Sequence, residues 1–176
     1  VGHANHMPGH VYSGLGMWRE AGLWMESATR IELRQMRERG LFPYDYWNFS
    51  HNRNYLAYIQ EQQGLVEQAL LGARTLLDSP TMPPGEEQDD DEESSEDPVQ
   101  FEGLTALVRC LLKFERWDEV LREGAIPWKE ENAAHEAWRA YAEALAHLGQ
   151  GDVPAAIESA SELREKTAEV EDEWRK

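Results

Sequence analysis

Three histidines with spacing suited to metal chemistry lie at the start of the chain. His3, His6 and His10 follow an i, i+3, i+7 progression, which places all three on one face of a helix that extends back to the first residues. If the helix begins at Asn5 instead, His6 and His10 are still one turn apart. Converging imidazole nitrogens suit zinc, copper, nickel or iron, and three protein ligands with one open position are usual in catalytic zinc sites.

A fourth histidine, His51, follows the aromatic segment 44–49 and precedes Asn52. Its helix is expected to lie beside the first helix, which brings His51, Asn52 and also Asp45 within reach of the N-terminal histidines. Two other interpretations of these residues remain open. The histidines can be structural and donate to backbone carbonyls, or they can line a polar pocket for an organic ligand or the end of a peptide.

No other segment carries a recognisable catalytic pattern. Neither Ser13 nor Ser50 lies in a nucleophile-elbow sequence, and there is no glycine-rich phosphate loop. Cys110 is the only cysteine, so it forms no intrachain disulfide, and its apolar neighbours predict a core position. The sequence therefore favours a non-catalytic protein over an enzyme.

The composition restricts the classes of partner. The net charge of -17 disfavours a nucleic-acid backbone or an anionic membrane surface. No stretch approaches the roughly 20 apolar residues of a membrane-spanning helix, and no signal peptide is visible. The single cysteine is compatible with a reducing compartment, which slightly favours the cytoplasm. The chain opens on Val1 rather than methionine, so an upstream export signal is left open.

Helix-sized amphipathic stretches come in pairs, and each pair turns at a short break followed by an apolar or aromatic residue. Such self-similarity is typical of helical repeats, in which each hairpin buries its apolar face against its neighbours. The four breaks lie in Leu15–Ala21, Gln63–Ala69, Phe114–Val120 and Gln150–Ala156.

The pattern predicts repeats one and two at residues 1–78, repeats three and four at 99–176, and an acidic, proline-rich loop at 79–98 between them. The loop is read as a disordered surface insertion, and the repeats as one continuous solenoid. Asn5 is the expected N-cap of the first helix. In the second helix the predicted inward residues are Leu23, Trp24, Ala28, Ile31 and Met36.

At these breaks the chain resembles the tetratricopeptide repeat family. Its pattern of an aromatic, a glycine, an aromatic or apolar residue and an alanine is matched by Tyr12, Gly16, Trp18 and Ala21, and in part at Gly64 and Gly151. The third repeat departs, with Glu115 in place of glycine and Val120 in place of alanine. The breaks are also spaced more widely than the family's period of about 34 residues.

A narrower resemblance is to a subgroup of large bacterial tetratricopeptide proteins in which an H-x-x-H-M-P-x-H helix opens one repeat, as residues 3–10 do here. It implies that the chain is the C-terminal part of a longer protein. The fold class expected is all-α, a right-handed solenoid of about four helical hairpins whose first helices line a concave surface.

The function expected is a scaffold that binds a protein or peptide on this concave surface, with no cofactor required. The predicted contact residues are His10, Tyr12, His51, Asn52, Tyr55 and Tyr58. The alternative is a metal-binding or metal-dependent enzymatic site for zinc or another transition metal, built from His3, His6, His10 and His51.

Overall fold

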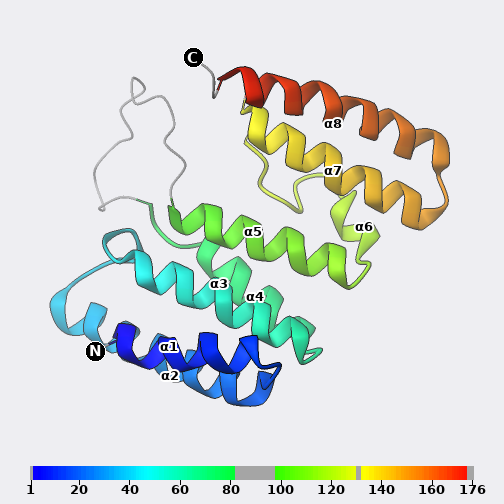
Figure 1. Ribbon diagram of the computed structural model, residues 1–176. Helices are drawn as coiled ribbons and strands as arrows, with labels where there is room; N and C mark the ends of the chain where they lie inside the picture. Colours follow the sequence, from blue (N-terminus) through cyan, green and yellow to red (C-terminus); the bar gives the residue numbers. More distant parts are fainter. Residues whose placement is uncertain (1, 82–97, 130–131, 174–176) are drawn as a thin grey trace. The chain divides into compact units, whose positions relative to one another are not determined.

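The computed structural model describes residues 2–81, 98–129 and 132–173, and over these ranges the chain is helical apart from short connections (Figure 1). No strand occurs in these ranges, so the predicted all-α class is confirmed. A short 3-10 helix, η1 (Pro43–Asp45), precedes α3. The α-helices are α1 (Gly2–Gly14), α2 (Trp18–Arg39), α3 (Trp47–Gln62), α4 (Val66–Leu77), α5 (Pro98–Lys113), α6 (Trp117–Val120), α7 (Ala133–Gln150) and α8 (Val153–Glu173).

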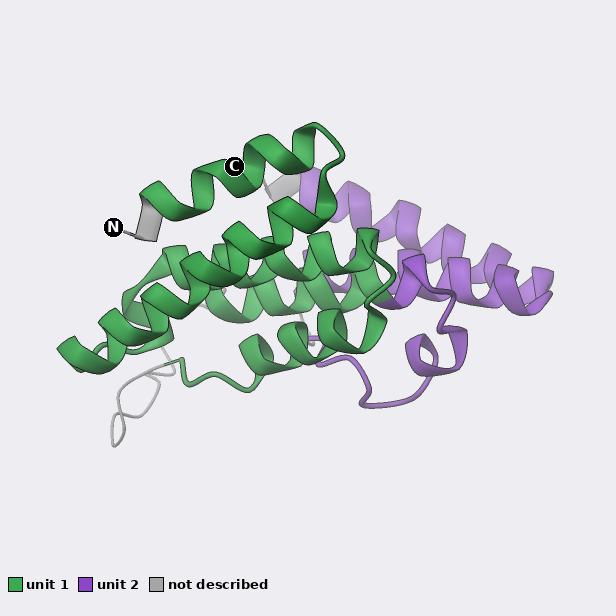
Figure 2. Ribbon diagram, turned by 90° about the horizontal axis from the view of Figure 1, so that it is seen from below, with its two compact units in different colours: residues 1–110 green, residues 111–176 purple. Residues whose placement is uncertain are grey.

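The chain forms two compact units, Val1–Cys110 and Leu111–Lys176 (Figure 2). The division falls within α5, whose first thirteen residues (98–110) belong to the first unit. Residues 82–97 of the predicted acidic loop lie outside the described residues. No helix in the described ranges is long and apolar enough to cross a membrane.

Helices that follow each other along the chain pack against each other. In the first unit α1 packs on α2, α2 on α3 and α3 on α4, and in the second unit α7 packs on both α6 and α8. Two glycines allow close approach in the first unit. A Cβ added to Gly9 would lie 2.9 Å from the Met25 side chain, and one added to Gly103 would lie 2.9 Å from Leu76 Cβ. A larger residue at Gly103 would also meet the backbone nitrogen of Leu77 and force the helices apart, whereas at Gly9 the flexible Met25 side chain would have to shift.

The four predicted breaks share one backbone conformation. At each break one residue has left-handed φ, and we call it the pivot residue. It follows the first helix of the pair and lies two residues before the first residue of the second helix. The pivot residues and their φ values are Gly16 at 72°, Gly64 at 73°, Glu115 at 53° and Gly151 at 83°. Glycine adopts this conformation without a Cβ clash. Glu115 is the only described residue other than glycine with positive φ, so the third break has the same geometry in spite of its sequence.

The structure corrects two local predictions. Helix α1 already includes Gly2, so Asn5 is not its N-cap and Pro8 lies inside the helix. In α2, Leu23 and Trp24 are 62% and 38% exposed. The inward stripe instead runs through Ala21, Met25, Ala28, Glu32 and Met36. Ala28 and Met36 are buried as predicted, whereas Leu23 and Trp24 are not. Glu32 was not predicted to be buried because a carboxylate is seldom fully buried.

The second unit buries mainly alanines on the inner side of α7, namely Ala137, Ala140, Ala142 and Ala146. Large apolar side chains of the same helix remain outside. Trp138, Tyr141 and Leu148 are 38%, 48% and 57% exposed. Small residues on the buried face let α8 approach α7 closely, while the large residues extend the exposed surface.

Candidate functional site

Three histidines from two helices come together in the first unit. His6 and His10 lie one turn apart on α1, with ring centroids separated by 5.1 Å. The ring of His51, on α3, lies 6.0 Å from that of His6 and 5.6 Å from that of His10. We call these residues the histidine cluster. The side chain of His3, the fourth predicted member, lies outside the described residues.

Aromatic residues of α3 continue the histidine cluster along the same helix. The ring of Tyr55 lies 4.1 Å from that of His10, and its hydroxyl is 2.6 Å from Ser13 Oγ. Tyr58 follows, with its ring 5.7 Å from Tyr55 and 5.9 Å from Trp18. These residues are half-buried, and Tyr12, Trp18, Tyr55 and Tyr58 pack on the core formed by Ala21, Met25, Leu56 and Ile59.

Asn52 lies inside the first unit and not on its surface. Its side chain is fully buried, and Nδ2 donates to both carboxylate oxygens of Glu32 on α2 at 2.8 and 2.9 Å. Burial raises the pKa of Glu32, and the hydrogen bond from Asn52 opposes that rise. Asn52, a predicted contact residue, therefore links α2 to α3 and presents no surface to a partner.

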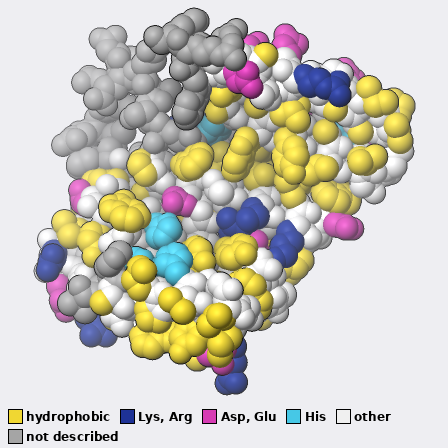
Figure 3. Space-filling model, in the orientation of Figure 1, with side chains coloured by type: hydrophobic (Ala, Val, Ile, Leu, Met, Phe, Trp, Pro, Cys, Tyr) yellow, Lys and Arg dark blue, Asp and Glu magenta, His cyan; other side chains and the backbone are white. Residues whose placement is uncertain are grey.

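A pocket of about 250 Å³ opens beside the histidine cluster. Histidine side chains gather at this part of the face shown in Figure 3, with hydrophobic and basic side chains nearby. All lining residues are half-buried, and they come from α3 and from the part of α5 that belongs to the first unit. They are His51, Asn54, Tyr55, Tyr58 and Arg109.

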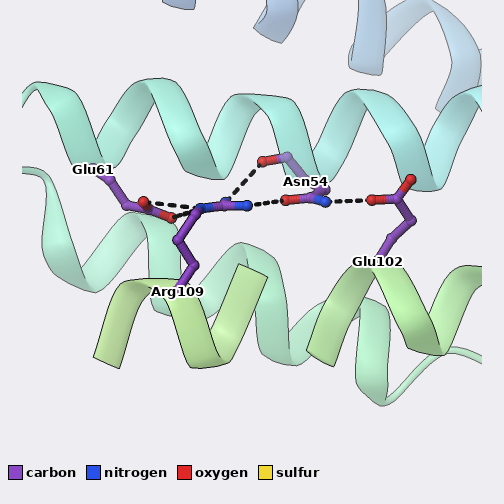
Figure 4. A network of polar contacts seen from close by, with 4 residues as sticks. All are labelled: Asn54, Glu61, Glu102 and Arg109. Carbon is purple, nitrogen blue, oxygen red and sulfur yellow. Dashed lines mark hydrogen bonds and ion pairs between the residues drawn. The ribbon is translucent and has the colours of Figure 1, made fainter. Parts of the chain in front are cut away.

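Arg109 is held on the pocket wall by a chain of polar contacts between α5 and α3 (Figure 4). Its Nε donates to both oxygens of Glu61 at 3.0 Å, and Nη2 donates to Glu61 Oε1 at 2.9 Å. Nη1 donates to Asn54 Oδ1 at 2.9 Å, and Asn54 Nδ2 in turn donates to Glu102. The guanidinium carbon lies 5.6 Å from the centre of the Tyr58 ring. Bidentate pairing and a neighbouring aromatic face fix the plane of the guanidinium.

Burial differs sharply between the two charged partners. The side chain of Glu61 is fully buried, whereas that of Arg109 is 30% exposed. The carboxylate therefore depends on Arg109 for compensation of its charge, while the guanidinium still reaches solvent. The pocket consequently has one cationic side chain whose orientation is fixed from behind.

Sequence reasoning missed Asn54, Glu61, Glu102 and Arg109. Arg109 stands alone as a charged residue among the apolar residues of α5 between Leu104 and Leu112. That isolation was a usable signal, because a charge inside an apolar stripe usually has a buried partner. The partner could not be read from the chain, since Glu61 lies 48 residues away.

As the side chains are placed, the described residues contain no group of three or more histidine, cysteine or acidic side chains that could hold a metal ion. One carboxylate lies near the histidine cluster: Glu102 Oε1 is 3.9 Å from His51 Nδ1. Cys110, predicted to be a core residue, is buried.

The second unit has a larger pocket, of about 600 Å³, between the segment 120–128 and α7. Its walls mix apolar groups with both charges, including Trp128, Arg122, Arg139 and Glu143. Arg139 already pairs with Glu143 one turn along the helix, at 2.7 Å. The pocket therefore lacks a dominant charge that would select a ligand.

Comparison with known proteins adds no identity to this geometry: the chain matches no protein-family model, no curated protein and no solved structure.

Proposed function

We propose that the protein is a helical-repeat scaffold of the tetratricopeptide type, which binds a peptide or protein segment along the first helices of its pairs. The observation that supports this is a shared register, meaning that residues of different first helices lie the same number of residues before their pivot residues. His51 and Glu102 each lie thirteen residues before their pivot residues, and Tyr58 and Arg109 each lie six residues before them. Tyr58 and Arg109, at corresponding positions of α3 and α5, therefore both line the pocket.

Helix α1 follows the same register. His6 lies ten residues and His10 six residues before the pivot residue Gly16, and Asn54 lies ten residues before Gly64. Positions six, ten and thirteen residues before the pivot residue form one stripe on a helix, because they recur at intervals of three and four. In the first unit the stripe carries polar and aromatic side chains instead of the aliphatic residues of the core.

The size of the pocket favours a peptide over a small-molecule substrate. A volume of about 250 Å³ lies below the roughly 300–1,000 Å³ usual for small-molecule sites. It fits one side chain of an extended segment. Half-buried tyrosines offer contact area at a low entropic cost, and a fixed guanidinium and amide select orientation.

In the second unit the residues at these positions are apolar. Trp138, Tyr141, Leu145 and Leu148 lie thirteen, ten, six and three residues before the pivot residue Gly151. Their stripe includes the exposed Trp138, Tyr141 and Leu148 described above. The register of the second unit therefore suits an apolar partner surface, whereas that of the first suits polar groups.

A peptide-display selection on the full chain tests the proposal. Peptides enriched by the wild-type protein would be synthesised with a fluorophore, and their affinity measured by fluorescence anisotropy. We expect Tyr58→Ala to weaken binding about tenfold or more, as truncation of an aromatic contact residue does. Trp24→Ala is the matched control, since Trp24 is an exposed aromatic residue on the second helix α2.

Equal binding by the wild type, Tyr58→Ala and Trp24→Ala would show that the peptides use another surface. Failure to enrich any sequence from a library that covers both polar and apolar segments would also count against a peptide-binding role.

A further inference from the structure

We propose that His6, His10 and His51 bind one transition-metal ion, of which zinc(II) is the expected species. This site adjoins the pocket proposed for a peptide and shares His51 with its lining, but its ligands are the imidazoles of the histidine cluster and not Tyr58 and Arg109. The three side chains come from α1 and α3 within the first unit.

The spacing of the rings matches metal coordination. A zinc–nitrogen bond of about 2.0–2.1 Å places the centre of an imidazole ring roughly 3.2 Å from the metal. Two such rings at a tetrahedral angle then have centres about 5.2 Å apart. The observed separations of 5.1, 5.6 and 6.0 Å lie at or slightly above this value, so binding requires a contraction of less than one ångström.

Ring rotation supplies the remaining change. In the present rotamers the imidazoles do not form a metal-holding group, and nitrogens must turn toward a common point. Rotation about the Cβ–Cγ bond turns the nitrogens but leaves the ring centre almost in place, and this torsion is broad for histidine. His6 and His10 also have the i, i+4 spacing with which a single helix presents two imidazoles to one metal.

Glu102 is positioned to orient one of the ligands. Its Oε1 is 3.9 Å from Nδ1 of His51, and Asn54 Nδ2 donates to its other oxygen. A small shift would let Nδ1–H donate to the carboxylate and leave Nε2 for the metal, which is the usual arrangement of a ligating histidine. The negative charge of Glu102 also favours a nearby cation.

The surroundings leave one coordination position for solvent. His6 is 3% exposed, while His10 and His51 are half-buried. A metal held by the three nitrogens would therefore be reached by water from the side of His10 and His51. Three histidines and one water make a four-coordinate zinc site.

Isothermal titration calorimetry of the untagged, chelator-stripped full chain with zinc chloride tests the site. We expect one ion per wild-type chain and loss of that binding in His10→Ala and His51→Ala. Glu102→Gln should weaken affinity about 10- to 100-fold, as removal of a carboxylate behind a ligating histidine does. His147→Ala on α7 is the matched control for nonspecific histidine binding and should bind as the wild type does.

Cobalt(II) gives a second measurement, because tetrahedral coordination produces an intense visible absorption. The band should form with the wild type and be absent in His51→Gln, a variant of similar volume whose helicity is checked by circular dichroism. No heat beyond dilution with the wild-type chain would overturn the proposal. So would a stoichiometric binding that persists unchanged in His51→Gln, or one that is lost in His147→Ala.

Discussion

The pair of Arg109 and Glu61 allows a quantitative test of how the first unit is stabilised. Replacing Arg109 with methionine removes the cation while keeping much of the aliphatic volume. The fully buried carboxylate of Glu61 then loses the donors Nε and Nη2, which lie at 2.9–3.0 Å. Breaking a buried ion pair from one side costs about 3–5 kcal/mol.

The opposite substitution is expected to cost less. In Glu61→Leu the remaining guanidinium is 30% exposed, so water replaces part of the lost pairing, and the hydrogen bond to Asn54 Oδ1 remains. We expect a loss of about 1.5–2 kcal/mol, at the lower end of the range for a hydrogen bond to a charged group. The double variant leaves no uncompensated charge and should lie within about 1 kcal/mol of the wild type. Its coupling energy would then exceed about 2 kcal/mol.

Urea unfolding of the four proteins, followed by circular dichroism and by fluorescence, measures these differences. The midpoint shift multiplied by the slope gives each change in the free energy of unfolding. Equal losses in the two single variants would refute the argument from unequal burial. Additive losses in the double variant would show that Glu61 and Arg109 are not coupled.

Three further substitutions follow from the packing, the backbone and the buried carboxylate. Gly103→Ala should lower the free energy of unfolding by about 1–3 kcal/mol, because its Cβ would lie 2.9 Å from the backbone nitrogen of Leu77; an unchanged urea midpoint would contradict this close contact. Glu115→Gly should raise the free energy of unfolding by about 1 kcal/mol, and the melting temperature with it, because it relieves a φ of 53°. An equal gain in Glu115→Ala would rule out the backbone explanation. Burial raises the pKa of Glu32 above 4.5, so its contribution to stability is present below 4.5 and is lost as the pH rises through the native pKa. Glu32→Gln should therefore gain stability relative to the wild type between pH 4 and pH 7, and a difference independent of pH would contradict the shift.

The helix pairs were predictable because their signals are local. Glycine at Gly16, Gly64 and Gly151 marks a left-handed residue directly, and apolar periodicity on both sides gives the helices. Glu115 carries no such mark, yet its φ of 53° lies in the same left-handed region. Its side chain is exposed, so the backbone alone bears the cost.

The choice of buried face was less predictable, and the reason is visible in α2. The predicted stripe contains Leu23 and Trp24, and the buried stripe contains Ala21 and Met25 in their place. The two stripes differ by a shift of only one or two residues, and hydrophobicity favours the larger side chains. The stripe that is buried contains Glu32, which is tolerated only because Asn52 donates to it from α3. A partner 20 residues away cannot be inferred from periodicity.

The candidate site also has one part that the sequence predicts and one part that it does not. The pairing of His6 with His10 follows from helical spacing, and the approach of His51 follows from the packing expected between neighbouring helices. The contacts of Arg109 with Glu61 and of Asn54 with Glu102 join positions 48 residues apart. They could not be predicted, since the sequence marks Arg109 as a charge within an apolar stripe but does not indicate which distant residue pairs with it.

The pivot residue connects the fold to the site. Because it follows the first helix of each pair, residues of different pairs can be compared by their distance along the chain from it. Tyr58 and Arg109 meet on the pocket wall because each lies six residues before a pivot residue, Gly64 or Glu115, with left-handed φ. A side chain six residues from a pivot residue is nearly two helical turns away from it, far enough for its chemistry to vary while its place in the stripe stays the same. The same position is accordingly histidine in α1, tyrosine in α3, arginine in α5 and leucine in α7, which is how one repeated backbone can present four different surfaces.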